Sequence, residues 1–274
     1  MQRPRHAPTH HARTRHATET WAAASGMHAR VVGAVIMRDL QTRFGAGYFG
    51  FLLGLMMPLG HLAIALVVNF IVGRKTPLGT NVTIFLMTGV LPFVLWLYSH
   101  RQIMMSLHQN IPLLSFPGVD VLDIFIGRFI VEFVNGSIVV SIAIAFMYFF
   151  SQDINVNDIS KFLYSLIASV LLGFGTGVIF GSLGYFNHMS ILIGNLLGPI
   201  MWVMSGIFFI PDDTPEIIRI ILSFNPLSHI IDSVRTSYYA EYSSSFASNY
   251  FIISAISALI LTSISLATIV RRSA

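Results

Sequence analysis

Arg128 and Glu132 lie four residues apart within an otherwise apolar stretch of the chain. That spacing places the two side chains on one face of a helix, where a cation and an anion can pair. Charged groups inside a membrane are costly unless they are paired, and they mark either a structural ion pair or a proton relay. We interpret Arg128 and Glu132 as a structural pair, with the proton relay as the alternative. His61, also in an apolar stretch, is interpreted as a packed, hydrogen-bonded side chain rather than a ligand.

The sequence lacks the residue patterns of the common hydrolases and nucleotide-binding enzymes. It contains no Cys, which excludes thiol nucleophiles, disulfides and thiolate metal sites. Its only lysines, Lys75 and Lys161, follow Arg74 and Ser160, so a phosphate-binding loop ending in Gly-Lys-Ser/Thr is excluded. We expect no catalytic residue, metal or cofactor in this chain. If the protein uses ATP, another chain must bind the nucleotide.

The elements that carry these residues are membrane spans. Five long stretches contain no Asp, Glu, Lys or Arg: 44–73, 76–100, 133–152, 162–211 and 242–270. A helix needs about 20 apolar residues to cross the bilayer, and 162–211 is long enough for two crossings around the polar break at 187–190. The composition is 54% hydrophobic and only 10% charged. We therefore predict an all-α polytopic membrane protein with six transmembrane helices. The first five are placed near 50–72, 82–103, 124–150, 162–186 and 190–210.

Two segments precede the spans. Residues 1–27 are predicted to form a disordered basic tail before a membrane domain over 28–272; the alternative, a metal-binding tract, rests on His6, His10, His11 and His16. Residues 28–44 are predicted to form an amphipathic helix at the membrane interface. Its apolar stripe comprises Val32, Val35, Ile36 and Leu40, and its basic residues include Arg38 and Arg43.

The placement of basic residues predicts the orientation. An even number of spans puts both termini on one side, which collects eleven of the sixteen basic residues: Arg3, Arg5, Arg13, Arg15, Arg30, Arg38, Arg43, Arg101, Arg128, Arg271 and Arg272. The positive-inside rule makes that side cytoplasmic. Trp96, Tyr98, His100 and Arg101 are predicted to form an interfacial collar at the end of the second span.

Two further patterns concern helix packing and a possible gate. Gly173, Gly177 and Gly181 recur at every fourth residue of the fourth span, a small-residue stripe that lets helices approach closely. Between the last two spans, Thr214 is predicted to cap an apolar helix over 215–224, which at about 15 Å is too short to cross a bilayer. Asn225 and Pro226 then break this helix and cap a second one. We predict a re-entrant or interfacial hairpin on the outer face, and a candidate gate.

The order and spacing of several motifs give the chain a family resemblance. They include Arg38-Asp39-x-x-x-Arg43-Phe44-Gly45, Thr88-Gly89-x-x-Pro92-Phe93, Asp123-x-x-x-x-Arg128-x-x-x-Glu132, Ser205-Gly206-Ile207-x-x-x-Pro211 and Asn225-Pro226-Leu227-x-His229-x-x-x-x-x-Arg235. With these motifs the chain resembles the membrane subunit of ABC-type polysaccharide exporters, the permeases that export capsular polysaccharide or O-antigen. The resemblance extends over about 28–272.

The resemblance implies a homodimeric permease in the bacterial inner membrane, paired with two copies of a separate subunit that binds ATP and Mg²⁺. It also implies periplasmic and outer-membrane export partners, and no nucleic acid. Coupling to the ATPase would run through the 105–118 connection and the 28–44 helix. The residues assigned to coupling are Arg38, Arg43, Asn110, Pro112 and Asp123. Those assigned to the glycan path or gate are Phe93, Trp96, Tyr98, Asn225, Pro226, Tyr238 and Tyr239, although aromatic residues also serve as interfacial anchors.

Other functions remain open at this stage. Within the same class, the cargo can be O-antigen, teichoic acid, a drug or a lipid. From a different class, the chain can be an ion-coupled carrier or a non-transporting membrane scaffold. The spans contain few ionisable residues that could bind a driving ion, which weighs against the carrier.

Overall fold

Side-chain caps fix where several helices begin. Asn81 Oδ1 accepts a hydrogen bond from the Thr83 amide at 2.9 Å at the start of α3 (Val82–Asn110). Asp158 Oδ1 accepts one from the Lys161 amide at 2.9 Å at the start of α5 (Ile159–Phe186). Such caps satisfy amides that have no partner in the first helical turn. The computed structural model describes residues 26–41, 48–73, 76–116, 118–151 and 156–273, and every regular element in these ranges is a helix.

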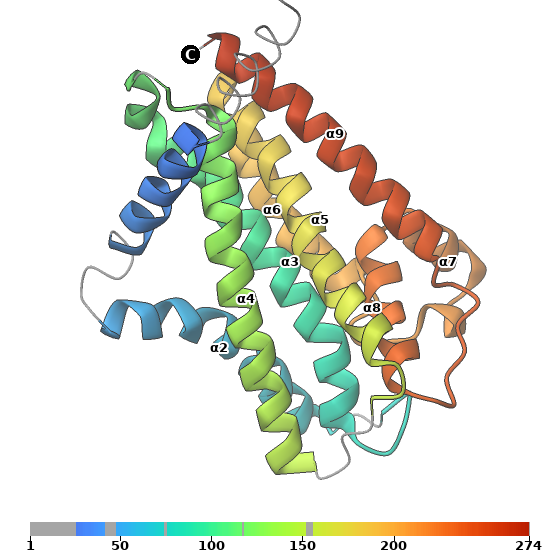
Figure 1. Cartoon of the computed structure of the whole chain (residues 1–274). Helices are drawn as coiled ribbons and strands as arrows, with labels where there is room; N and C mark the ends of the chain where they lie inside the picture. The colour runs from blue at the N-terminus through green and yellow to red at the C-terminus, as the bar shows by residue number, and fades with distance from the viewer. Residues whose placement is uncertain (1–25, 42–47, 74–75, 117, 152–155, 274) are drawn as a thin grey trace, which may run out of the picture.

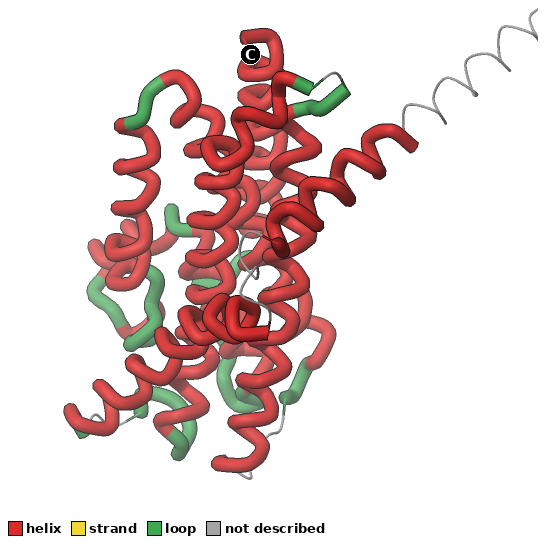
Figure 2. Tube along the Cα trace, turned by 90° about the vertical axis from the view of Figure 1, so that its left-hand side faces the viewer, coloured by secondary structure: helices red, strands yellow, loops and turns green. Residues whose placement is uncertain are grey.

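The helices follow one another with short connections (Figures 1 and 2). A helix over 26–41 precedes α2 (Tyr48–Val72), α3, the 3₁₀ turn η1 (Ile111–Ser115), α4 (Val121–Ser151), α5, α6 (Met189–Met204), the 3₁₀ turn η2 (Pro211–Asp213), α7 (Glu216–Ser223), α8 (Pro226–Tyr238) and α9 (Asn249–Ser273). Most of the predicted basic tail, with its four histidines, and Arg43 lie outside the described residues.

The membrane-protein class is confirmed. Among the described residues, five helices are long and apolar enough to cross a bilayer: α2, α3 with η1, α4, α5 and α9. The sixth apolar helix, α6, has only 16 residues, a length of about 24 Å. The predicted extent of this span, to residue 210, was wrong. The helix ends after Met204 because Gly206 adopts a left-handed conformation with φ of 73°.

The predicted end of the second span, at residue 103, was also wrong. The helix α3 continues to Asn110, because neither Gly nor Pro occurs between Pro92 and Pro112. Trp96 and His100 are therefore buried inside the protein, with exposed fractions of 2% and 0%, and do not form an interfacial collar. Arg101 lies within the helix, nine residues before its end.

The predicted hairpin is present as a sharply bent pair of helices. The axes of α7 and α8 meet at 102°. Asn225 caps α8 as expected, since its Oδ1 accepts a hydrogen bond from the Leu227 amide at 3.0 Å. The cap predicted for the preceding helix was wrong. Thr214 instead donates its hydroxyl to the Pro211 carbonyl at 2.7 Å, and α7 starts after Pro215 with no side-chain cap.

The centre of the bundle is the contact between α3 and α5. Most of α3 is buried, whereas α2, α4 and α9 are largely exposed to what would be lipid. A Cβ atom built at Gly173, Gly177 or Gly181 would lie 2.7–2.9 Å from atoms of α3, so these glycines permit the close approach of the two helices. Figure 1 shows α9 on one outer side of this pair and α4 on the other.

Candidate functional site

Arg128 is the centre of a buried charge network that joins three helices. Its Nε lies 3.2 Å from Glu132 Oε1, so the ion pair inferred from the sequence spacing is present. The guanidinium group also forms an ion pair with Asp39 of the 26–41 helix and donates a hydrogen bond to Gln102 of α3. The Arg128 side chain is 2% exposed. The network attaches the N-terminal helix to the bundle, and Asp39 is a partner that spacing alone does not reveal.

A hydrogen bond and an ion pair join both ends of the described chain to the start of α4. His28 Nδ1 lies 2.9 Å from Asp123 Oδ2, and Arg271 Nη1 lies 2.9 Å from Asp120 Oδ2. The 26–41 helix, the end of α9 and the segment before α4 therefore lie together at one end of the molecule (Figure 1). We call this cluster of four residues the end junction.

The other described residues assigned to ATPase coupling are Asn110, Pro112 and Arg38. Asn110 is buried and donates its side-chain amide to the Ser106 carbonyl at 2.8 Å, which closes the last turn of α3. Pro112 is exposed in η1, and Arg38 is half-buried on the 26–41 helix. Two apolar side chains project outward from the same segment, Ile111 and Phe116, with 39% and 60% of their surface exposed. The end of the molecule that carries the end junction thus exposes two apolar side chains beside its polar contacts.

A cluster of aromatic rings fills the space between α2, α3 and α6. The centroid of Trp202 lies 4.8 Å from those of both His61 and Phe93. On α3, Trp96 stacks on His100 with the ring planes 11° apart. The packing inferred for His61 is thus present; its hydrogen bond stays a prediction. Phe93 and Trp96, assigned to the glycan path, are covered by protein and present almost no surface to a polymer in this conformation.

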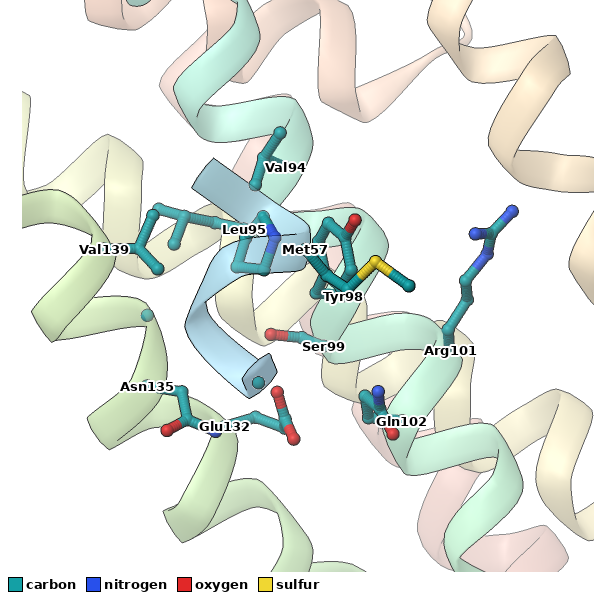
Figure 3. A pocket seen from close by; sticks show the side chains of 13 residues that line it. Met57, Val94, Leu95, Tyr98, Ser99, Arg101, Gln102, Glu132, Asn135 and Val139 are labelled. Atoms are coloured by element: carbon teal, nitrogen blue, oxygen red, sulfur yellow. The ribbon is translucent and has the colours of Figure 1, made fainter. Parts of the chain in front are cut away.

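A cavity of about 450 Å³ lies between α2, α3 and α4 (Figure 3). Its polar lining comprises Tyr98, Ser99, Arg101, Gln102, Glu132 and Asn135. Figure 3 shows Glu132 and Asn135 on one side, Gln102 facing them from α3, and Arg101 extending away at the far end. Of the aromatic residues assigned to the glycan path, Tyr98 faces this cavity. The sequence did not single out Gln102 or Asn135, which bear no charge or motif.

The hairpin of α7 and α8 is held to the end of α6 by buried hydrogen bonds. Asn225 donates its side-chain amide to the Met204 carbonyl at 2.8 Å, and Ser228 donates its hydroxyl to the same carbonyl at 3.0 Å. Arg235, which is fully buried, donates to the carbonyls of Ile207 and Phe209. The buried, non-helical backbone after α6 is therefore satisfied by side chains of α8, as a membrane environment requires.

The assigned gate residues of the hairpin do not form one site. Asn225 and Pro226 lie at the start of α8, whereas Tyr238 ends the helix and Tyr239 follows it, about 20 Å away. Near the two tyrosines, Asp232 accepts hydrogen bonds from Tyr242 Oη, at 2.8 Å, and from Ser244. This polar cluster carries no motif that would have disclosed it in the sequence.

Comparison with known protein families decides the membership of the chain. The profile of the family described as "ABC-2 type transporter" matches residues 30–239, well over half of the 274 residues. The chain belongs to the ABC-2 type transporter family. The matched region of this ABC-2 chain includes the Arg128 network, the cavity and α8, but not α9. Proteins of this kind are transmembrane components of ABC transporters and work with partner subunits.

Individual relatives of the ABC-2 chain are capsule and O-antigen export proteins. It is 24% identical over 244 residues to the capsule polysaccharide export inner-membrane protein CtrC of Neisseria meningitidis serogroup A, covering 88% of this chain and 91% of that protein. It is 26% identical to the polysialic acid transport protein KpsM of Escherichia coli, covering 78% and 83%. It is 24% identical to the O-antigen export system permease protein RfbA of Klebsiella pneumoniae, covering 72% and 76%.

Proposed function

We propose that this chain is the membrane subunit of an ATP-driven exporter that moves a capsule-type polysaccharide across the bacterial inner membrane. The names of the relatives support the cargo, and the near-complete coverage of those relatives supports the same overall task. A separate subunit binds ATP and Mg²⁺ and hydrolyses the nucleotide, since this sequence has no Gly-Lys-Ser/Thr loop. O-antigen remains a second candidate cargo, favoured by the relative from Klebsiella.

The exporter contains two copies of this chain and two ATP-binding subunits, and it hands its polymer to periplasmic and outer-membrane proteins. Both termini face the cytoplasm, because most of the basic residues lie on their side of the membrane and the positive-inside rule makes that side cytoplasmic. The end junction then faces the ATP-binding subunit. Arg38, Arg43, Asn110, Pro112 and Asp123 transmit its movement to the spans.

The observation that carries this proposal is the exposed apolar segment at the end junction. Ile111 and Phe116 project from η1 and the residue after it, and an exposed apolar pair beside the contacts of the end junction suits a protein–protein contact. Contact with an ATP-binding subunit is the route by which this chain would use the energy of ATP. The Arg128 network weighs against an ion-coupled carrier. Glu132 and Asp39 are already paired with Arg128, so they are not available to bind a driving ion.

The experiment is co-purification of the chain with the ATPase encoded beside its gene, together with an assay of surface glycan. Deletion of the gene should trap polymer in the cytoplasm. Phe116→Asp should abolish recovery of the ATPase while the chain remains folded, and Tyr250→Asp, at a more exposed aromatic in the first turn of α9, is the control. Normal surface glycan in the deletion strain, or ATP hydrolysis by the purified chain alone, would refute the proposal.

A further inference from the structure

The N-terminal helix over 26–41 packs closely against the first turns of α4. A Cβ atom built at Gly127 would lie 2.9 Å from Cγ1 of Val35, so the contact between the two helices depends on a glycine here. Four residues after Val35, Asp39 forms its ion pair with Arg128, the residue that follows Gly127. The apolar and the charged contact lie about one turn apart on the N-terminal helix, so a shift of that helix changes both.

Arg128 joins this helix to two walls of the cavity between α2, α3 and α4. Its Nη1 pairs with Asp39, and its Nη2 donates a hydrogen bond to Gln102 Oε1 on α3. Its Nε lies 3.2 Å from Glu132 Oε1 on α4. Gln102 and Glu132 both line the cavity, and Figure 3 shows Gln102 facing Glu132 from the other helix. One guanidinium group thus connects the N-terminal helix, α3 and α4 at the cavity.

Gln102 and Glu132 lie at one end of this cavity. Among the lining residues, Gln102 is the last along α3 and Glu132 is the first along α4. The two helices run in opposite directions, so both residues lie toward the same end of the molecule (Figure 1). The lining extends away from them as far as Val94 and Val139. The bridge through Arg128 therefore holds α3 and α4 together at the end of the cavity nearest the N-terminal helix.

The bridge to α3 depends on Asp39, because the three partners of Arg128 bind it with unequal strength. A carboxylate binds a guanidinium group more strongly than a neutral amide does. With Asp39 in place, one terminal nitrogen is fixed on the N-terminal helix and the other reaches Gln102. Without Asp39, the strongest remaining partner is Glu132, four residues away on the same helix. The contact with Gln102 is then the one that weakens.

We propose that Arg128 is a positioning residue through which the N-terminal helix controls the cavity. Displacement of this helix withdraws Asp39, weakens the contact with Gln102 and lets α3 and α4 separate at that end of the cavity. The inference rests on the proposed function for the source of the displacement, which is the ATP-binding subunit. It adds a route from the N-terminal helix into the membrane that does not pass through η1.

The test measures how fast a water-soluble maleimide reaches the cavity in the full chain, reconstituted in nanodiscs. The sequence contains no Cys, so a single introduced cysteine is labelled without background. Asn135→Cys reports from the cavity lining. Ser243→Cys, at an exposed position between α8 and α9, is the control reporter. Mass spectrometry of the intact protein gives the labelling rate of each reporter.

Asp39→Asn should raise the labelling rate at position 135 by about fivefold or more, a factor typical of coupling between two sites. Gly127→Val should raise it as well, because the new side chain displaces Val35 and with it the N-terminal helix. The matched controls on the same helix are Arg30→Gln, at an exposed position, and Gly33→Val, where a Cβ meets nothing within 4 Å. Both should label at the parent rate.

Labelling at position 243 should be the same in every variant. Parent rates at position 135 in folded Asp39→Asn and Gly127→Val chains would overturn the proposal. An equal rise at positions 135 and 243 would also overturn it, because it would show a general loosening of the fold. Elution as a single species and the unfolding temperature establish that each variant is folded.

The assembled exporter supplies a second measurement, in which the Arg128 network is intact. The chain with Asn135→Cys is purified with its ATPase and labelled with and without a non-hydrolysable ATP analogue. The labelling rate should depend on the nucleotide when Asp39 is present and should lose this dependence in Asp39→Asn. A rate that ignores the nucleotide in the parent chain would overturn the proposal, and so would an equal nucleotide effect in Asp39→Asn.

Failure of this inference can be told apart from failure of the export proposal. Export is scored in cells, where normal surface glycan in the deletion strain would refute it. The labelling rates of the chain in nanodiscs require neither the ATPase nor the polymer, so they would stand unchanged. Trapped polymer in the deletion strain together with parent labelling rates in the folded variants would refute the role of Arg128 alone.

Discussion

Arg235 on α8 donates a hydrogen bond from Nη2 to the backbone carbonyl of Ile207 at 2.7 Å, across a chain separation of 28 residues. Its Nη1 donates to the Phe209 carbonyl at 2.8 Å, and its guanidinium carbon lies 4.2 Å from the centre of the Phe85 ring. One buried side chain thus satisfies two carbonyls of the non-helical segment after α6 and packs against α3. The packing of α8 against the end of α6 and against α3 therefore depends on this residue.

Arg235→Met should therefore destabilise the protein by about 3 kcal/mol, because two buried carbonyls lose charge-assisted partners. Arg235→Lys should recover little of the loss, since a single ammonium lacks the fork that reaches both carbonyls. Thermal unfolding in detergent measures the effect. Arg219→Met, on the exposed face of α7, is the control and should unfold like wild type. Equal unfolding temperatures for the Arg235 and Arg219 variants would contradict the assigned role.

Arg128→Met should cost about 3–5 kcal/mol, because Asp39 and Glu132 are left as buried carboxylates without their cation. Simultaneous replacement of Arg128, Asp39 and Glu132 by apolar residues should recover much of this loss. Denaturant unfolding of the single and triple variants measures the coupling. Arg30→Met, at an exposed position of the same N-terminal helix, supplies the reference. Simple additivity of the three substitutions would show that the charges do not form one network.

Gly177→Val should impair folding, since even its Cβ would lie 2.8 Å from the His100 carbonyl oxygen and 2.9 Å from Ile103 Cβ. Overpacking of this kind typically costs about 1–3 kcal/mol, and a β-branched side chain adds further atoms. The yield of monodisperse protein and its unfolding temperature report the effect. Gly33→Val, where a Cβ meets nothing within 4 Å, serves for comparison. Wild-type behaviour of Gly177→Val would remove the claim of close packing between α3 and α5.

Asn225 has two functions that substitution can separate. Asn225→Asp keeps the acceptor that caps α8 at the Leu227 amide but loses donation to the Met204 carbonyl. Asn225→Ala loses both, and the lost cap alone is expected to cost about 1 kcal/mol. The alanine variant should therefore be the less stable of the two in the same unfolding assay. The reverse order would show that the cap contributes nothing measurable.

Tyr242 should make the stability fall at high pH. Burial first, and the neighbouring Asp232 carboxylate second, raise the pKa of its phenol above the ordinary value. The unfolded chain therefore loses the phenolic proton at a lower pH than the folded chain, so stability falls as pH rises above about 10 and is unaffected by this group below it. Tyr242→Phe should flatten this part of the profile, whereas Tyr250→Phe, at an exposed position, should not. An unchanged slope in Tyr242→Phe would contradict the assignment.

Much of the architecture follows from the sequence because membrane spans can be recognised as stretches without charged residues. The spans, the break at 187–190 and the Asn225 cap each depend on residues close together in the chain. The end of α6 was misplaced because the apolar run continues through 205–210, and only the left-handed Gly206 and the α8 side chains beyond it stop the helix.

The partners of the candidate site were less predictable. Glu132 could be paired with Arg128 because the two lie four residues apart. Asp39 could not, because its contact with Arg128 joins residues 89 positions apart and depends on how the N-terminal helix packs. Gln102, Asn135 and Gly136 are ordinary residues in an apolar run, and they acquire a common surface once α2, α3 and α4 are assembled.

The end junction has a mechanical consequence. Because His28 and Arg271 bind neighbouring acids of a single turn, Asp123 and Asp120, the first and last described helices share one anchoring point. A displacement of that turn moves the 26–41 helix and the end of α9 together, without passing through the intervening spans. The signals of fluorescent reporters on the 26–41 helix and on α9 would then change at the same rate.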